Sequence, residues 1–185
     1  MNIKAMISNR VGRLLSGKAA RFVRQQDGAA AIEFGLVAAP FLALVFAILE
    51  TAMVFFAGQS LEAAVAVSSR LIMTGQAQTA GYTAATFKNA VCTNIVALFD
   101  CANKLSVNVQ TFTDFNSATT NSPYTNGQFD PSKVQYSPGT QGSVVIVQLY
   151  YQWPIYVSLL SNNLANQNGN NRLLVATAAF KNEPY

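Results

Sequence analysis

The chain contains no histidine. This absence excludes the Ser-His and Cys-His nucleophilic sites, and no glycine-rich phosphate loop occurs either. Acidic residues after position 28 are few and scattered: Glu33, Glu50, Glu62, Asp100, Asp114, Asp130 and Glu183. A paired-carboxylate catalytic site is therefore poorly supported. We rank a membrane-anchored enzyme last among the function classes, and we expect no cofactor and no metal site.

Charge is also scarce, at 11% of the residues against about 25% in typical soluble domains. Together with a hydrophobic share of 51%, this scarcity of charge indicates a chain built around a membrane segment or an oligomeric contact. The charge is unevenly placed, because six basic residues and one acid, Asp27, precede Gly28: Lys4, Arg10, Arg13, Lys18, Arg21 and Arg24. This head carries +5, which leaves −1 for the rest of the +4 chain. The folded part therefore lacks the basic excess of a nucleic-acid surface, and no nucleic acid is expected as a partner.

A long apolar run follows this basic head, from Ala29 to Ala57, and only Glu33 and Glu50 bring charge into it. It exceeds the apolar core of about 7–15 residues in a secretory signal and is ample for a span of about 20 residues. Basic residues flank the cytoplasmic side of such a span. The sequence therefore predicts a cytoplasmic head and an exported part after about residue 58.

The apolar run predicts a helix from Ala29 to about Met73, roughly 68 Å long and about twice the thickness of a bilayer core. Its outer half should cover the exported domain through a stripe at helical spacing, Leu61, Val65, Ser68 and Ile72, with Glu62, Ser69 and Arg70 able to point to water. Pro40 should kink the helix. Gly75 and Gly81 predict a stop and a turn.

The exported part should be α+β, with a second helix from about Thr83 to Phe99 and three strands. The helix carries the apolar stripe Phe87, Val91, Ile95 and Leu98. The strands are predicted at 105–111, 143–153 and 173–181, as an antiparallel sheet whose apolar face is covered by the long helix. We divide the chain into a basic leader (1–28), a transmembrane helix that extends into the exported domain (29–75) and the exported domain (76–185).

Two cysteines, Cys92 and Cys101, lie in the exported part. An even number of cysteines in an oxidising compartment predicts a disulfide, and the alternative is two reduced, buried thiols. The bond would pin the end of the second helix to the chain that follows it. A metal site at these cysteines is not expected, because the chain has no histidine and few carboxylates are near.

Two weaker signals remain in the exported part. Asp114, Asn116, Asn126 and Asp130 could line a calcium site within the polar loop 113–142, but their spacing matches no known motif and a solvated loop is the better interpretation. A loop of that length without structure of its own is often functional. Tyr150, Tyr151, Trp153 and Tyr156 could form a ligand platform, although aromatic residues on strands are more often core or subunit contacts.

Residues 28–50, GAAAIEFGLVAAPFLALVFAILE, resemble the N-terminal region of TadE-like pseudopilins of the Tad (Flp, type IVc) pilus system. The last ten residues, ATAAFKNEPY, also resemble the end of that family. The resemblance implies a pilin-like fold and a prepilin leader that a membrane-embedded prepilin peptidase cuts after Gly28, which leaves Ala29 as the new N-terminus. Glu33, the fifth mature residue, would then meet the amino group of a neighbouring subunit, with Phe34 beside it and Pro40 as the family's helix kink.

Two features of the chain differ from related pilins. Ala29 stands where many type IV pilins carry a methylated phenylalanine, and Gly35 stands where this family more often has alanine. Major Flp pilins are little more than the helix, whereas 157 residues follow Gly28 here. The size favours a minor subunit.

The resemblance implies a bacterial inner-membrane protein with its N-terminus in the cytoplasm and its C-terminal domain in the periplasm, or outside the cell in the pilus. Its expected partners are the prepilin peptidase, other pilin subunits, the pilus assembly platform and inner-membrane lipids. We predict a minor pilin that acts in pilus initiation, assembly or at the tip. The alternatives are an uncleaved periplasmic scaffold of the same machine, in which Glu33 is only a snorkelling carboxylate, and an adhesin subunit that uses the 113–142 loop.

Overall fold

The computed structural model describes residues 28–95, 99–120, 122–156, 164–167 and 169–185. The chain divides into two compact units, Met1–Val45 and Phe46–Tyr185, and their boundary falls inside the long helix. The helices are α2 (Ala29–Met73), α3 (Gln76–Thr79), α4 (Ala84–Cys92), α5 (Cys101–Lys104) and the 3-10 helix η2 (Pro131–Lys133). The strands are β1 (Leu105–Phe112), β2 (Tyr124–Thr125), β3 (Gln128–Phe129), β4 (Val144–Pro154) and β5 (Asn171–Lys181). Residues 1–27 of the predicted leader lie outside the described residues.

Helix α2 has the predicted bounds and ends where a glycine takes a left-handed conformation. Gly75 has φ +77°, and a Cβ atom at this position would collide with the ring of Tyr185. The backbone N–H of Glu183 donates to the carbonyl of Met73 at 2.9 Å, which satisfies one of the last carbonyls of α2. Pro40 lies inside α2, and the predicted kink at this residue stays a prediction.

The three predicted strands form one antiparallel sheet in the order β1-β4-β5, so β4 is central. β4 pairs with β1 from Leu105↔Tyr151 to Phe112↔Val144, and with β5 from Val144↔Lys181 to Pro154↔Asn171. Nearly every residue of β4 is buried, because both faces of the sheet are covered. The predicted α+β architecture is confirmed.

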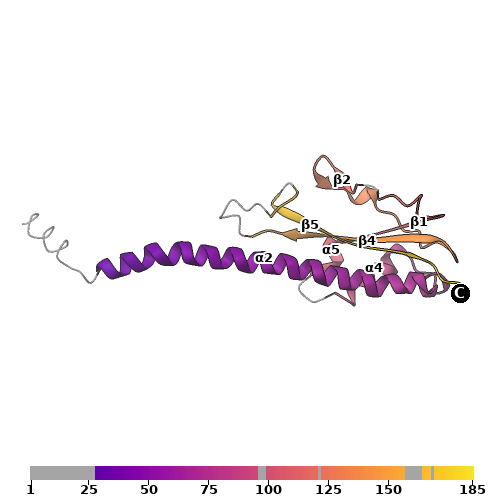
Figure 1. Ribbon diagram of the computed structural model, residues 1–185, viewed down its shortest axis with the longest axis horizontal. Helices are drawn as coiled ribbons and strands as arrows, with labels where there is room; N and C mark the ends of the chain where they lie inside the picture. Colours follow the sequence, from indigo (N-terminus) through magenta and orange to yellow (C-terminus); the bar gives the residue numbers. More distant parts are fainter. Residues whose placement is uncertain (1–27, 96–98, 121, 157–163, 168) are drawn as a thin grey trace, which may run out of the picture. The chain divides into compact units, whose positions relative to one another are not determined.

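Residues 46–73 of α2 cover one face of this sheet, and Figure 1 shows the helix running along it beneath β4. The buried residues of α2 include the predicted stripe, Leu61, Val65, Ser68 and Ile72. They pack against alternate residues of the strands, among them Val109, Val147 and Leu149. The expectation that Ser69 points to water was wrong: it is buried, and its hydroxyl donates to the carbonyl of Ala66 at 3.1 Å, so its polar group is satisfied inside the helix.

The second helix begins as predicted but ends early, so its predicted end at Phe99 was wrong. Thr83 caps α4 by accepting a hydrogen bond from the N–H of Thr86. At the other end, the side chains of Thr93 and Asn94 both donate to the carbonyl of Ala90, at 2.7 and 3.0 Å. These local bonds compete with the helical ladder and favour a stop after Cys92. Leu98 of the predicted stripe lies outside the described residues.

The polar loop 113–142 contains structure of its own. β2 and β3 form a small hairpin, and Asn126 and Gly127 at its turn both have positive φ. The chain then runs along the outer edge of β1, where the N–H of Val109 donates to Gln135 at 2.8 Å and the N–H of Ser137 donates to Val109 at 2.9 Å. Figure 1 shows the hairpin on the side of the sheet away from α2, so this loop covers the second face.

Candidate functional site

Gly28 and Ala29 stand at the exposed start of α2. Gly28 directly precedes the helix, and no atom lies within 4 Å of the position a Cβ would take there. Ala29 is the first helical residue and is also exposed. Both residues are thus exposed within the part of the chain that the structure describes.

Glu33 and Phe34 lie one turn further along α2 and both are exposed, Phe34 by 75%. Among the described residues, Glu33 has no ion-pair partner. The carboxylate is thus placed where an amino group of another chain could reach it.

Large exposed apolar side chains stand on α2 directly before and after these residues: Ile32, Leu36, Val37, Phe41, Leu42, Leu44, Phe46, Ile48, Leu49, Met53, Phe55 and Phe56. Soluble monomers rarely expose a contiguous apolar surface of this extent. By length and composition α2 could cross a membrane. The surface therefore requires lipid or other protein around it.

Glu50, the second carboxylate of the apolar run, is buried, and the sequence alone gave it no role. Its Oε1 accepts a hydrogen bond from the backbone N–H of Tyr156 at 2.6 Å, which joins α2 to the end of β4. A pocket of about 240 Å³ opens beside it, lined by Phe46, Leu49, Glu50, Met53, Trp153 and Tyr156. The signal in the sequence was a charge about 20 residues into an apolar run, because such a charge needs a partner.

Cys92 and Cys101 form a disulfide, with their Cα atoms 5.8 Å apart. Cys92 is the last residue of α4 and Cys101 the first of α5, so the bond joins these two helices. The Nζ of Lys88 donates to the carbonyl of Ala102 at 2.7 Å and reinforces the same junction.

The carboxylates suggested for calcium are each engaged in a local turn. Asp114 accepts from the N–H of Ser117 at 2.8 Å, and this bond is the main cause that lowers the pKa of Asp114 below 3.8. Asp130 accepts from the hydroxyls of Ser132 and Thr125 at 2.6 and 2.8 Å, which lowers its pKa in the same way. Asn116 and Asn126 are exposed. No group of three acidic, cysteine or histidine residues that could hold a metal ion occurs in the described part of the chain.

The four aromatic residues of the suggested platform are not on one surface. Tyr151 and Trp153 face the core, where the ring of Phe99 packs edge-on against them at 4.7 and 5.7 Å between centroids. Tyr150 points to the opposite face and packs against Phe129 of the hairpin. Tyr156 is 81% exposed. The alternation of side chains along β4 places Tyr150 on one face of the sheet and Tyr151 and Trp153 on the other, while Tyr156 lies beyond the end of the strand.

A buried polar network on the second face of the sheet was also missed from the sequence. Gln148 Oε1 accepts from Asn108 Nδ2 at 3.1 Å and from the hydroxyl of Tyr150 at 2.8 Å. Asn108 Oδ1 accepts from the N–H of Gln135 in the covering loop at 2.9 Å. Burial raises the pKa of the Tyr150 hydroxyl. The network attaches the 113–142 loop to the sheet.

The model of the TadE-like protein family matches residues 28–70. The match begins at Gly28 and includes Glu33, Phe34, Pro40 and Glu50. It does not include the last ten residues, whose resemblance to the family stays a prediction. No curated protein and no solved structure matches the chain.

Proposed function

We propose that this protein, whose residues 28–70 are TadE-like, is a minor pilin (pseudopilin) of a Tad/Flp-type pilus. The family indicates a structural protein associated with the Tad pilus, with other pilin subunits as partners. One observation carries the finer proposal: the matched segment begins with an exposed Gly28, and an exposed Glu33 follows five residues later at the start of a helix long and apolar enough to span a membrane.

The proposal assigns a role to each part of the chain. Residues 1–28 are a leader that a prepilin peptidase removes after Gly28. Residues 29–75 anchor the subunit in the inner membrane, with the N-terminus in the cytoplasm, and later pack in the filament core. Residues 76–185 form the periplasmic domain that selects neighbours and contacts the assembly platform. A sheet domain of this size supports a minor subunit, one that acts at initiation or at the tip.

Glu33 supplies the register between subunits in this proposal. Cleavage after Gly28 would free the α-amino group of Ala29, and a charged carboxylate in an apolar helix bundle is stable only when it is paired and hydrogen-bonded. Glu33 is exposed, and among the described residues it has no ion pair that would have to break first. The amino group of a neighbouring subunit is the partner that the processed chain itself provides.

The intact mass of the membrane-extracted protein tests processing, in strains with and without the prepilin peptidase. We expect a peptidase-dependent loss of residues 1–28. A full-length chain in both strains would instead support an uncleaved scaffold of the secretion machine. A Gly28→Asp variant separates the same two functions, because the scaffold requires no cleavage and would keep its function.

The assembly role of Glu33 is tested by a Glu33→Ala variant, with Glu62→Ala as the matched control. Glu62 is a second exposed glutamate on α2, beyond the apolar run. We expect Glu33→Ala to be cut normally but to assemble at least about tenfold less pilus, the effect of losing one paired charge. Normal piliation with Glu33→Ala would refute the pairing role and leave the processing result untouched.

A further inference from the structure

The pocket beside Glu50 opens on a surface made by one side of α2 and the end of β4, which we call the interfacial surface: Phe46, Leu49, Glu50, Met53, Trp153 and Tyr156. We propose that this surface rests on the outer boundary of the membrane and binds phospholipid, with the ring of Tyr156 at the level of the headgroups. The inference rests on the proposed membrane-anchored form of the protein. The surface would hold the exported domain against the membrane before assembly.

The position of the surface along the chain matches the expected boundary of the bilayer. The apolar run begins at Ala29, and a span needs about 20 residues, so it reaches the outer boundary near Glu50. From Phe34 to Leu49 no residue is charged. The first carboxylate after this run therefore lies where the hydrocarbon ends, and the end of β4 lies beside it.

The interfacial surface combines aromatic and apolar side chains, as is typical of protein surfaces at the membrane interface. Tryptophan and tyrosine are enriched at headgroup level, because one end of each ring is apolar and the other is polar. Tyr156 is 81% exposed and Phe46 53%, and the pocket between them is lined almost entirely by apolar atoms. Glu50, the one charged group of this surface, is directed to a backbone N–H. Such a surface fits acyl chains and the glycerol region better than it fits a charged protein partner.

The surface is held in shape before any lipid binds. Glu50 fixes the backbone of Tyr156 on α2. The next residue back, Ile155, donates its N–H to the carbonyl of Asn170 at 3.0 Å and accepts from Asn170 Nδ2 at 2.6 Å. Trp153 is packed edge-on against Phe99. The backbone that carries the exposed ring of Tyr156 is thus held by Glu50 and, one residue earlier, by Asn170, so lipid binding would have to order little of the described part of this surface.

Exposed apolar side chains of α2 also occur just before and just after Glu50 along the chain. Ile48 is 59% exposed just before Glu50, and Phe55 and Phe56 are exposed just after it. At the level of Glu50, α2 is therefore apolar on more than one of its sides, because Ile48 and Phe55 point away from the side that lines the pocket. A second copy of the chain is the alternative occupant, and the experiment below separates the two.

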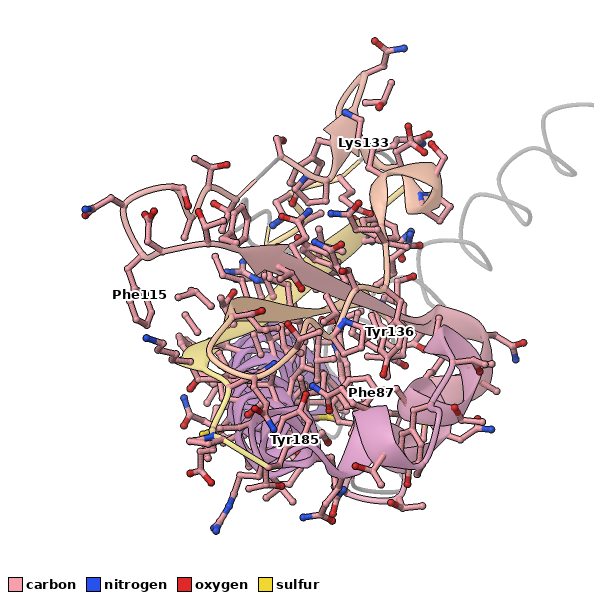
Figure 2. The ribbon with its side chains drawn as sticks, turned by 90° about the vertical axis from the view of Figure 1, so that its right-hand side faces the viewer. Phe87, Phe115, Lys133, Tyr136 and Tyr185 are labelled. Carbon is pink, nitrogen blue, oxygen red and sulfur yellow. A yellow bond between two sulfur atoms is a disulfide. The ribbon has the colours of Figure 1, made fainter. Side chains whose placement is uncertain are left out.

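The test uses the full chain in phosphatidylcholine vesicles that carry bromine either near the headgroup end or near the methyl end of the acyl chains. Trp153 is the single tryptophan. In a Trp153→Phe background, one tryptophan is introduced at a time: at Tyr156 in the interfacial surface, at Phe41 in the apolar run, or at Phe115. Phe115 is exposed and projects from the 113–142 loop (Figure 2), so it is the control.

We expect the shallow bromine to lower the fluorescence of Tyr156→Trp about twofold and the deep bromine to lower it less, because interfacial rings lie at headgroup level. Phe41→Trp should show the reverse order, and Phe115→Trp no quenching. The native Trp153, which lines the pocket, provides the same measurement without any substitution and should also respond more to the shallow bromine.

Quenching at Phe41→Trp but at neither Tyr156→Trp nor Trp153 would overturn the interfacial surface and leave the anchored pilin standing. No quenching at Phe41→Trp would refute the membrane anchor. It would then also refute the interfacial surface and the proposed function. A Tyr156→Trp signal that follows the protein-to-lipid ratio and not the position of bromine would assign the surface to a second copy, which also overturns the proposal.

Discussion

Replacing Glu50 by alanine should loosen the end of β4 from α2. The lost contact is a hydrogen bond from the backbone of Tyr156 to a carboxylate that is only 8% exposed. Hydrogen bonds to charged groups contribute about 1.5–3 kcal/mol, and an amide left without its acceptor adds a desolvation cost. We expect a loss of about 2 kcal/mol in local stability, which corresponds to about a 30-fold larger opening equilibrium at the Tyr156 amide. Glu50→Gln keeps an oxygen acceptor but no charge. Its opening equilibrium at the Tyr156 amide should lie between those of the wild-type chain and of Glu50→Ala.

Amide hydrogen exchange of Tyr156 measures this opening directly, in the full chain held in lipid nanodiscs. Trp153 fluorescence is a second readout, because this side chain lines the same pocket. Glu62→Ala is the matched control, since Glu62 is an exposed glutamate on the same helix.

Exchange at Tyr156 that is equal in Glu50→Ala and in Glu62→Ala would refute the reasoning. It would mean that other contacts hold the end of β4 and that the carboxylate is not a positioning group. A similar loss of protection throughout β1, β4 and β5 would also contradict the prediction, which concerns one junction and not the sheet as a whole.

Two further predictions concern the exported domain. Cys92 and Cys101 are nine positions apart, so replacing both by serine should lower the free energy of unfolding by roughly 2.6 kcal/mol on the chain-entropy relation, measured by urea denaturation with the single substitutions as controls. Hydrogen bonds lower the pKa values of Asp114 and Asp130 in the folded chain, so their stabilising effect is present above pH 3.8 and is lost as the pH falls through the folded values. The Ser117 and Ser132 amides should therefore lose exchange protection below about pH 3.8, and an unchanged profile in Asp114→Asn would contradict this at Ser117.

Helix α2 and the three strands of the main sheet were predictable because each depends on a pattern of neighbouring residues. The apolar run and Gly75 set the extent of α2, since a left-handed residue ends a helix regardless of what surrounds it. The alternation at Leu105, Val107 and Val109 placed β1 with its apolar side toward α2. The roles proposed for Gly28 and Glu33 were predictable for the same reason, because they depend on the spacing of the two residues within one segment.

Local patterns could not predict where side chains compete with the backbone for a hydrogen bond, nor which distant segments come into contact. The end of α4 depends on two polar side chains that both reach the carbonyl of Ala90, which helical periodicity does not reveal. The role of the 113–142 loop as a cover depends on Asn108 and Gln148, two buried polar residues of different strands, and the N–H of Gln135 in the loop donates to Asn108 from 27 residues away along the chain.

The sequence by itself determined the long apolar helix, the basic head before it, the antiparallel strands and the spacing from Gly28 to Glu33, because these are properties of neighbouring residues. Only the tertiary structure decided what Glu50 does. Its partner, the N–H of Tyr156, is 106 residues away along the chain, and no periodicity joins them. A buried carboxylate requires a hydrogen-bond donor, but the fold alone selects which donor comes within reach.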